Sequence, residues 1–409
     1  MFLLYIDPGT GSMLFSVFIG IVSALVFLFR KVFIKIKFVL SGGKIEKISA
    51  AKIPYVIFTD HKRYWNIFKP VCDEFERRGV ELAYWTASPD DPALLEKYQH
   101  VKAQFIGEGN KAFAKLNMMN ACIVLSTTPG LDVYQWKRSK NVDYYVHIRH
   151  TVDDPLGYRM FGYTFYDAIL LSGDFQEDYI KKLEAARNEP KKEVAVVGCT
   201  YMDQMANRLQ SEPKPDNAVP VVLLAPSWGP SAILAKFGSK ILDALIATGY
   251  KIIVRPHPQS FTSDKDIIEP LMERYPNSER IEWNRDNDNF AVLNQADLMI
   301  TDFSGIIFDY TLVFDKPIIY ADTSFDKAPY DAAWIDEPLW RFSVLSNLGL
   351  KLQEADFPNI KQIIQNLLTD DSFAQGRKRV REQAWQFKGE GAKRTVDYLQ
   401  AKYKELRHE

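Results

Sequence analysis

The residues best suited to phosphate chemistry follow a predicted strand in the second half of the chain. Residues 297–301 (DLMIT) form a short strand candidate, and the sequence DFSG (302–305) separates it from a helical pattern. The start of a helix presents free backbone N–H groups and the positive end of its dipole, which favour a bound phosphate. Ser304 adds a hydroxyl donor, and Gly305 lets a ligand approach the backbone. The alternative is that Asp302 or Ser304 only caps the helix.

A second group of this kind is the sequence RPHP (255–258), which directly follows the predicted strand YKIIV (250–254). Its two prolines stiffen the loop. Arg255 could hold phosphate oxygens in a bidentate grip. His257 could donate to a pyrophosphate oxygen or protonate a leaving phosphate. A structural histidine is the alternative.

A third strand end carries Ser227 and Trp228, after the apolar run 221–226 (VVLLAP). Ser227 could donate to a phosphate, and Trp228 could pack near a nucleotide base. A turn with a core tryptophan is the competing interpretation.

In the first half of the chain, His147 and His150 lie three residues apart in YYVHIRHTVDD. Residues at this spacing on an extended strand point to opposite faces, so the two rings are not expected to act as a pair. His150 lies nearer the following loop and is the better candidate for a base that removes a proton from a hydroxyl. Asp153 or Asp154 could orient it, and Arg149 could contact an anionic acceptor. His147 remains a possible alternative base, and a buried structural role for His150 also stays open.

The elements that must position these groups alternate between short apolar runs and helical patterns, which predicts parallel sheets with helices on both faces. The polar stretch 211–220 (SEPKPDNAVP) interrupts the alternation and indicates a linker. We therefore expect an α/β protein of the GT-B class. Two Rossmann-like, doubly wound domains, residues 51–210 and 220–375, would face a cleft, followed by a helical tail at 376–409. Ligands in such folds bind outside the carboxyl ends of the strands.

The N-terminal segment, residues 1–40, has a different character. Residues 13–29 carry no charge, and Arg30, Lys31, Lys35 and Lys37 follow them. This length is near the lower limit for a spanning helix, and the basic residues place the C-terminal side in the cytoplasm. We expect a single-pass anchor in the inner (cytoplasmic) membrane with cytoplasmic catalytic domains. A buried or interfacial helix is the alternative, and the basic strip could lie on anionic lipid.

Composition excludes several other classes. The chain has 409 residues and a formal net charge of -1, which does not suggest a nucleic-acid-binding protein. Its three cysteines are far apart and favour neither disulfides nor zinc. Asp286 and Asp288 form a DxD in a polar loop without other ligand types nearby. No metal or cofactor is implied.

Taken together, RPHP and the segment ITDFSGIIFDYTLVFDKPIIY (300–320) resemble the CDP-glycerol glycerophosphotransferases of bacterial teichoic-acid synthesis. The family carries R-x-H-P, then T-D-Y-S-S-x-x-F-D-[FY], then K-P, and the APSW sequence at 225–228 resembles its A-P-[TS]-W. The matching residues are Arg255, His257, Pro258, Thr301, Asp302, Ser304, Phe308, Asp309, Lys316 and Pro317. Gly305 departs from the pattern, since the family more often has serine there. His150 lacks the glycine that usually follows the family's catalytic histidine.

The resemblance implies a transferase of cell-wall or capsule polymer synthesis. An acceptor hydroxyl on a lipid-linked polymer would attack the β-phosphorus of CDP-glycerol, or of another CDP-polyol, and CMP would leave. His150 and His257 would be catalytic. Donor-binding residues would be Ser227, Arg255, Thr301, Asp302, Ser304, Gly305 and Asp309. A glycosyltransferase of the same architecture and a non-catalytic membrane scaffold remain the competing hypotheses.

Overall fold

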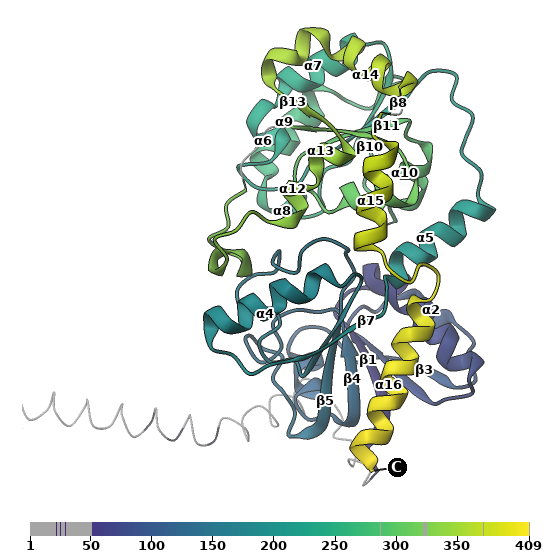
Figure 1. Ribbon diagram of the computed structural model, residues 1–409, viewed down its shortest axis with the longest axis vertical. Helices are drawn as coiled ribbons and strands as arrows, with labels where there is room; N and C mark the ends of the chain where they lie inside the picture. Colours follow the sequence, from purple (N-terminus) through teal and green to yellow (C-terminus); the bar gives the residue numbers. More distant parts are fainter. Residues whose placement is uncertain are drawn as a thin grey trace, which may run out of the picture.

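Figure 1 shows the computed structural model of the chain. The structure describes residues 51–286, 288–321, 325–370 and 372–408, together with Val22, Leu25 and Phe29. These last three are helical and exposed. The rest of the predicted anchor, residues 13–29, lies outside the described residues. In the part that is described, no helix combines the length and apolar character needed to cross a membrane.

A parallel sheet forms the centre of the N-terminal half. Its buried strands are rich in β-branched and aromatic residues, such as IPYVIFT in β1 and NACIVLS in β4. The strand order is β3-β2-β1-β4-β5-β6-β7. The strands are β1 (Ile53–Thr59), β2 (Leu82–Thr86), β3 (Val101–Phe105), β4 (Asn120–Ser126), β5 (Asn141–Ile148), β6 (Ala168–Leu171) and β7 (Glu193–Val196).

A second parallel sheet forms the centre of the C-terminal half, with the order β10-β9-β8-β11-β12-β13. Its strands are β8 (Val221–Ala225), β9 (Lys251–Val254), β10 (Ile281–Trp283), β11 (Leu298–Thr301), β12 (Ile318–Ala321) and β13 (Gly349–Leu352). The predicted α/β class with two parallel sheets is thus confirmed. Strand order reverses between β1 and β4 in one sheet and between β8 and β11 in the other. Ligands bind at such reversals, beyond the carboxyl ends of the strands.

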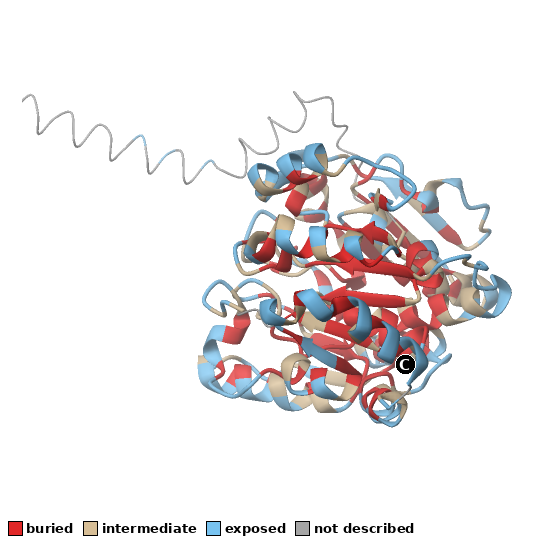
Figure 2. Cartoon of the chain, turned by 90° about the horizontal axis from the view of Figure 1, so that it is seen from above, coloured by how far each residue is buried: buried red, intermediate tan, exposed pale blue. Residues whose placement is uncertain are grey.

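Helices cover both sheets, and Figure 2 shows the strands as a buried layer beneath partly exposed helices. The longer helices have apolar residues at intervals of three and four, as Ile67, Phe68, Val71, Cys72 and Phe75 illustrate in α2. In the N-terminal half the helices are α2 (Trp65–Arg77), α3 (Asn110–Leu116), α4 (Phe175–Arg187) and α5 (Thr200–Ser211). In the C-terminal half they are α6 (Ile233–Phe237), α7 (Ser239–Ala247), α8 (Ser260–Ser263), α9 (Lys265–Arg274), α10 (Phe290–Gln295), α11 (Ile306–Phe308), α12 (Trp340–Ser343), α13 (Leu345–Leu348) and α14 (Ile360–Thr369).

Short 3-10 and π turns complete the set: η1 (Lys62–Tyr64), η2 (Pro92–Leu95), η3 (Asp309–Val313), η4 (Asp331–Trp334) and η5 (Glu354–Asn359). Of these, η1 follows β1 and η3 follows α11, so both lie just beyond the carboxyl ends of strands that flank the two reversals. The η3 segment is a π-helix, a form that is often found at functional sites.

The last two helices connect the halves. Helix α15 (Ala374–Ala384) packs against α13 and η3 of the C-terminal half, whereas α16 (Gly391–Arg407) packs against α2 of the N-terminal half. Figure 1 shows this yellow segment crossing from the upper to the lower half. One apolar core cluster also spans the boundary, because Val152 and Met202 belong to the same cluster as Phe308 and Trp340. The two halves are therefore packed together on this side.

Candidate functional site

His150 lies directly beyond β5, where the N-terminal sheet faces the C-terminal half. Its Nδ1 atom is 2.7 Å from the hydroxyl of Thr127 and 3.3 Å from that of Tyr158. The Tyr64 ring centroid is 5.2 Å from that of His150. Burial, followed by the charges of Arg149 and Arg63, lowers the pKa of His150 to about 3. The imidazole is therefore neutral at pH 7, which is the form a general base requires.

His147 occupies a different environment, although it is on the same strand. Its side chain is 0% exposed, and three tyrosine rings surround it at centroid distances of 4.9 to 5.5 Å: Tyr158, Tyr163 and Tyr166. Neither ring nitrogen has a hydrogen-bond partner among the described residues. A ring enclosed in this way has no accessible nitrogen in this structure, which favours His150 over His147 as the proposed base.

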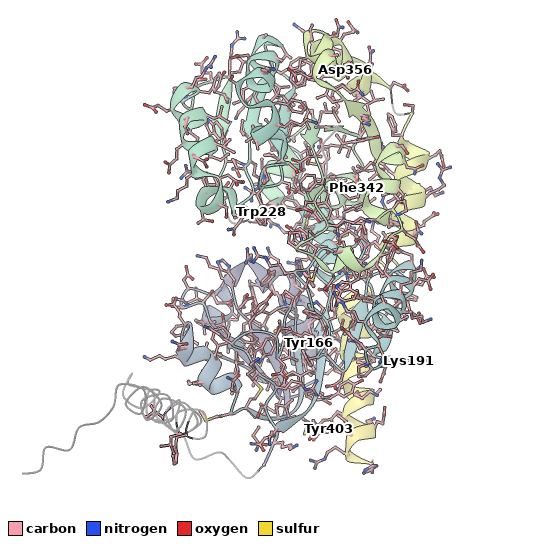
Figure 3. All side chains as sticks on the ribbon, turned by 90° about the vertical axis from the view of Figure 1, so that its left-hand side faces the viewer. Tyr166, Lys191, Trp228, Phe342, Asp356 and Tyr403 are labelled. Carbon is pink, nitrogen blue, oxygen red and sulfur yellow. The ribbon has the colours of Figure 1, made fainter. Side chains whose placement is uncertain are left out.

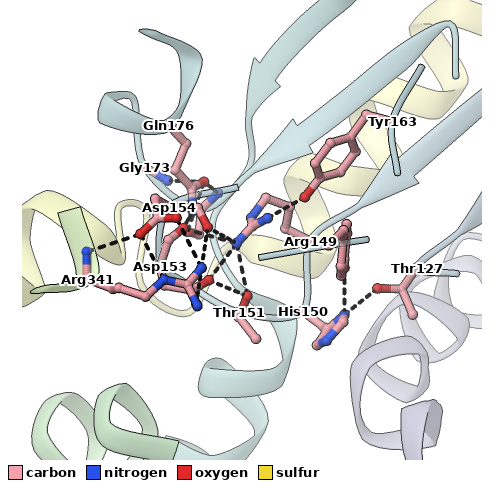
Figure 4. A network of polar contacts seen from close by, with 12 residues as sticks. Thr127, Arg149, His150, Thr151, Asp153, Asp154, Tyr163, Gly173, Gln176 and Arg341 are labelled. Atoms are coloured by element: carbon pink, nitrogen blue, oxygen red, sulfur yellow. Dashed lines mark hydrogen bonds and ion pairs between the residues drawn. The ribbon is translucent and has the colours of Figure 1, made fainter. Parts of the chain in front are cut away.

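The charged residues next to His150 form a buried network that joins the two halves (Figure 4). Arg149, which is 3% exposed, donates to Tyr163, Thr151 and Asp153. Its two terminal nitrogens are engaged by buried partners and the residue is almost fully enclosed, which leaves no exposed group for the expected contact with an acceptor.

Asp153 and Asp154 belong to the same network and do not orient His150. Both pair with Arg341 of the C-terminal half, at 3.1 and 3.0 Å respectively. Burial alone would raise the pKa of Asp154, but the charge and hydrogen bonds of Arg341 outweigh it and the pKa is lowered. Thr127 and Tyr158 orient the histidine instead, and nothing in the sequence near His150 indicated Thr127.

His257 follows β9 and is the counterpart of His150 in the other half. The backbone N–H of Gln259 donates to its Nδ1 (3.1 Å), so the neutral ring carries its proton on Nε2. Burial and the charge of Arg63 lower the pKa of His257 to about 4. Its ring lies 6.4 Å from that of Trp228. In Figure 3, Trp228 is on the edge of the C-terminal half that faces the N-terminal half across an open gap.

Thr301 and Asp302 have supporting roles in the structure, which corrects their assignment as donor contacts. Thr301 is 0% exposed and its hydroxyl donates to the carbonyl of Ala225 (2.7 Å). Asp302 is 1% exposed and accepts from the backbone N–H groups of Ser227 and Ile233, both at 2.8 Å. Burial raises the pKa of Asp302 to about 6. These bonds fix the loop that carries Ser227, whose half-buried side chain remains available.

Arg255 is also a supporting residue and not a free phosphate ligand. It is 8% exposed, and its guanidinium donates to the side chains of Asn284 and Asn289 and to the carbonyl of Asp286. The arginine therefore holds the 284–289 loop against the strand end that carries His257. Asn284 and Asn289 lie 29 and 34 residues further along the chain, so spacing alone could not identify them as its partners.

Ser304, Gly305 and Asp309 are half-buried, and each keeps its side chain or backbone accessible. A Cβ atom added at Gly305 would meet no atom within 4 Å, so the space beside it is open. The expected helix is different in form: α11 has three residues and continues as the π-helical turn η3. Burial, with the charge of Asp153, raises the pKa of Asp309 to about 8. Asp309 is therefore mostly protonated at pH 7.

Arg63 is the site residue that sequence reasoning missed. It is an exposed residue of η1, and its guanidinium lies over the Tyr64 ring, 5.0 Å from the ring centroid. Its charge lowers the pKa of both His150 and His257, which come from opposite halves. The two histidines therefore face a common region that Arg63 borders. One clue was its place just after the first strand, at the predicted carboxyl edge of the sheet.

The two aspartates of the DxD sequence each have a partner within the protein. Asp288 pairs with Arg208, and Asp286 accepts from Asn284 (2.8 Å). Among residues 51–286, 288–321, 325–370 and 372–408, no cluster of three histidine, cysteine or acidic side chains could hold a metal ion.

Similarity to known proteins agrees with this geometry. Residues 178–333 match the model of the family described as CDP-Glycerol:Poly(glycerophosphate) glycerophosphotransferase. A comparison with curated proteins by sequence found no match. Among solved structures, the wall teichoic acid polymerase TagF soaked with CDPG matches with a TM-score of 0.59 and 14% identity, covering 93% of this chain and 99% of TagF.

Two further solved structures share the fold. A putative UDP-N-acetylglucosamine 2-epimerase from Listeria monocytogenes has a TM-score of 0.55 at 13% identity, covering 87% of this chain and 98% of its own. The S. aureus MnaA structure with UDP has a TM-score of 0.57 at 14% identity, covering 88% and 98%. At such identities these likenesses establish the fold alone.

The class of protein is therefore a two-sheet α/β protein with the fold of TagF and of nucleotide-sugar epimerases. Within that class, the resemblance to the CDP-glycerol glycerophosphotransferases is confirmed over residues 178–333. This segment contains both motifs, RPHP and TDFSG, but not His150.

Proposed function

We propose that the protein transfers glycerol phosphate, or a related polyol phosphate, from CDP-glycerol or another CDP-polyol to a hydroxyl of a lipid-linked surface polymer, releasing CMP. One observation carries the proposal. His150 and His257, one from each half, are both neutral at pH 7 and both lie within the electrostatic reach of Arg63. A base on one side and a proton-bearing imidazole on the other suit a displacement at phosphorus between them.

His150 acts as the base in this mechanism. In the tautomer that the mechanism requires, the proton is on Nδ1, 2.7 Å from the Thr127 hydroxyl, and the Nε2 lone pair is available to take the proton of the acceptor hydroxyl. The acceptor oxygen then forms a bond to the β-phosphorus, and the bond between that phosphorus and the bridging oxygen breaks. The electron pair leaves with CMP. A dianionic donor beside His150 would raise its low pKa and strengthen it as a base.

The C-terminal half holds the donor. The Nε2–H of His257 donates to a diphosphate oxygen and stabilises the negative charge on the leaving CMP. Ser227 and Ser304 add hydroxyl donors, and the open space at Gly305 allows the phosphates to approach the backbone. Asp309, protonated at pH 7, can lie beside the diphosphate without charge repulsion and can donate a hydrogen bond. Trp228 would stack near the cytosine.

The membrane part of the proposal rests on the sequence. Residues 13–29 would anchor the chain, and the basic strip that follows would add attraction to anionic lipid. The catalytic halves would then act on a polymer held at the cytoplasmic face. Removal of residues 1–40 should reduce sedimentation with vesicles while leaving CMP release from a soluble acceptor intact.

The function is tested by CMP release from CDP-glycerol and CDP-ribitol, and by UDP release from UDP-sugars, with membranes as the acceptor source. We expect CMP release from one CDP-polyol, lowered in His150→Ala and His257→Ala. His100→Ala is the matched control, because His100 lies beside Glu81 away from both histidines. Turnover of UDP-sugars alone would contradict the proposal in favour of a glycosyltransferase, and no turnover of any donor would favour a scaffold.

A further inference from the structure

A cavity of about 570 Å³ opens in the N-terminal half beyond the carboxyl ends of β1, β2 and β3. Phe58 and Asp60 line it from β1 and its following loop, Ser88 from the loop after β2, and Glu108 from the loop after β3. This volume is within the range of about 300–1,000 Å³ that is typical of small-molecule sites. The position, beyond the carboxyl ends of parallel strands, is where α/β folds bind ligands.

Two short segments connect the cavity wall with residues that contact His150. Asp60 accepts a hydrogen bond from the hydroxyl of Thr128 (3.0 Å), and the neighbouring Thr127 lies 2.7 Å from His150 Nδ1. On the other rim, the η1 turn runs from the cavity wall to Tyr64, whose ring contacts that of His150. The cavity wall is therefore connected to the residues that contact the proposed base.

The wall of the cavity is preorganised and carries more negative than positive charge. The backbone N–H of Lys62 donates to Ser88 (3.0 Å), which ties the β1 and β2 loops together. Asp60, Asp90 and Glu108 line the cavity, and among the residues that the structure describes Lys62 is the only lysine or arginine in its lining. That lysine is already paired with Asp90. Two carboxylates, those of Asp60 and Glu108, thus have no cationic partner among the described residues of the wall.

The excess of carboxylates in the wall favours neutral, hydroxyl-bearing ligands over phosphates. A phosphate in the cavity would lie near unneutralised carboxylates, which disfavours it. Hydroxyl groups would donate to the same carboxylates and form charge-assisted hydrogen bonds. The half-buried ring of Phe113 adds an apolar surface against which the C–H face of a sugar ring could pack. His61, whose pKa is lowered by burial and by Arg63, is neutral at pH 7 and gives an anion no compensating charge.

We propose that this cavity binds the terminal residue of the acceptor and that this residue is a neutral, polyhydroxylated group such as a sugar, not a phosphate-bearing polyol. The bound residue directs one hydroxyl toward His150, while Asp60 and Glu108 accept hydrogen bonds from others. The statement that one hydroxyl attacks beside His150 rests on the proposed function. The preference for neutral polyhydroxyl ligands is independent of that function, because it follows from the cavity wall alone.

Binding to the full chain, measured by saturation-transfer NMR without any donor, tests the proposal. The probes are methyl β-glucopyranoside, N-acetylglucosamine and glycerol 3-phosphate. We expect at least one sugar to bind more tightly than glycerol 3-phosphate. Glu108→Gln and Asp60→Asn should each weaken sugar binding about tenfold, since hydrogen bonds to charged groups are the strong ones. Glu108→Lys should weaken the sugar and strengthen glycerol 3-phosphate.

Glu96→Gln is the matched control, because Glu96 is an exposed glutamate of the same half that does not line the cavity. It should leave all affinities unchanged. Tighter binding of glycerol 3-phosphate than of either sugar would overturn the proposal. So would sugar binding that survives both Glu108→Gln and Asp60→Asn, or the absence of sugar binding at the solubility limit. A chain that binds sugar but releases no CMP would refute the proposed function alone.

Discussion

Replacing His147 by phenylalanine should preserve the reaction and make the protein less sensitive to acid. The His147 ring packs edge-on against three tyrosines, Tyr158, Tyr163 and Tyr166, at interplanar angles of 72° to 84°. A phenyl ring can make the same contacts. It also removes two buried nitrogen atoms that have no hydrogen-bond partner among the described residues.

The magnitude follows from the linkage between protonation and folding. An unfolded histidine has a pKa of about 6.5. In the folded protein, burial and then the charge of Arg149 lower the pKa of His147 well below that value. Between the two values the unfolded chain binds a proton that the folded chain does not, so acid favours unfolding. As the pH decreases from 6.5 toward the lowered pKa of folded His147, the free energy of unfolding therefore falls by about 1.4 kcal/mol for each pH unit. Below that lowered pKa it no longer changes.

At pH 7.5 both states carry a neutral ring, so this contribution vanishes. At this pH, removing the unpaired polar atoms should stabilise the variant by about 1–3 kcal/mol. The strain of a larger ring should destabilise it by about 1–3 kcal/mol. The two proteins should be nearly equal in stability at that pH. Below pH 6.5 the free energy of unfolding of the wild type should fall more steeply than that of His147→Phe. The difference should be about 1.4 kcal/mol for each pH unit.

Urea unfolding followed by tryptophan fluorescence at pH 7.5, 6.0 and 5.0 measures this difference, with CMP release as the parallel assay. Equal pH dependence in the two proteins would mean that the folded His147 titrates normally, and the reasoning from burial would fail. Loss of CMP release in a folded His147→Phe protein would identify His147 as the base after all.

Three other predictions concern the site and its support. His150→Ala and His257→Ala should each lower kcat about 10²- to 10⁴-fold with unfolding midpoints near wild type. The kcat/KM of the wild type should stay flat from pH 7 to 6, because the pKa values of both histidines lie at about 3 to 4 and Asp309, with a pKa of about 8, stays protonated over this range. An acidic limb near pH 6.5 would contradict the lowered values. Arg341→Leu should destabilise the protein by about 3–5 kcal/mol in calorimetry, since it leaves buried Asp154 unpaired, and a loss below 1 kcal/mol would show that the pair contributes little. Gly305→Ala should keep the free energy of unfolding within about 0.5 kcal/mol of the wild type, because the space beside Gly305 is open. Gly349→Ala should prevent normal folding, because the added Cβ would lie 1.8 Å from the Ile318 carbonyl oxygen. Equal thermal midpoints of the two variants would refute this steric argument.

Much of the fold could be predicted because buried parallel strands leave a strong pattern. The apolar run PYVIF (54–58) predicts a buried strand, and the structure has β1 (Ile53–Thr59) there. The pattern at 174–187 predicts a helix, and the structure has α4 (Phe175–Arg187) there. The residues at 104–107 (QFIG) also predict a strand, but the structure has β3 at Val101–Phe105, in which Val101 alone is buried. An edge strand with so few buried residues has little periodicity to mark its ends.

The site was predictable in part. Motif order placed His257, Ser304 and Ser227 at strand ends, where the structure also has them. Arg255 and Asp302 belong to the same motifs, but their side chains bond to neighbouring loops of the protein. A motif identifies which side chains occur together and does not show what each one contacts. The helical pattern after Gly305 likewise did not predict the π turn η3, which depends on packing against α5 and α15.

The sequence by itself determined the two-sheet α/β class, the family resemblance and the groups capable of phosphate chemistry, because these depend on residue type and short spacing. Only the tertiary structure decided which of them meet. It enclosed His147 and left His150 beside Thr127, brought Arg63 toward histidines of both halves, and placed Arg341 on Asp153 and Asp154. Contacts between residues far apart in the chain follow from how the halves pack, and no local pattern encodes that packing.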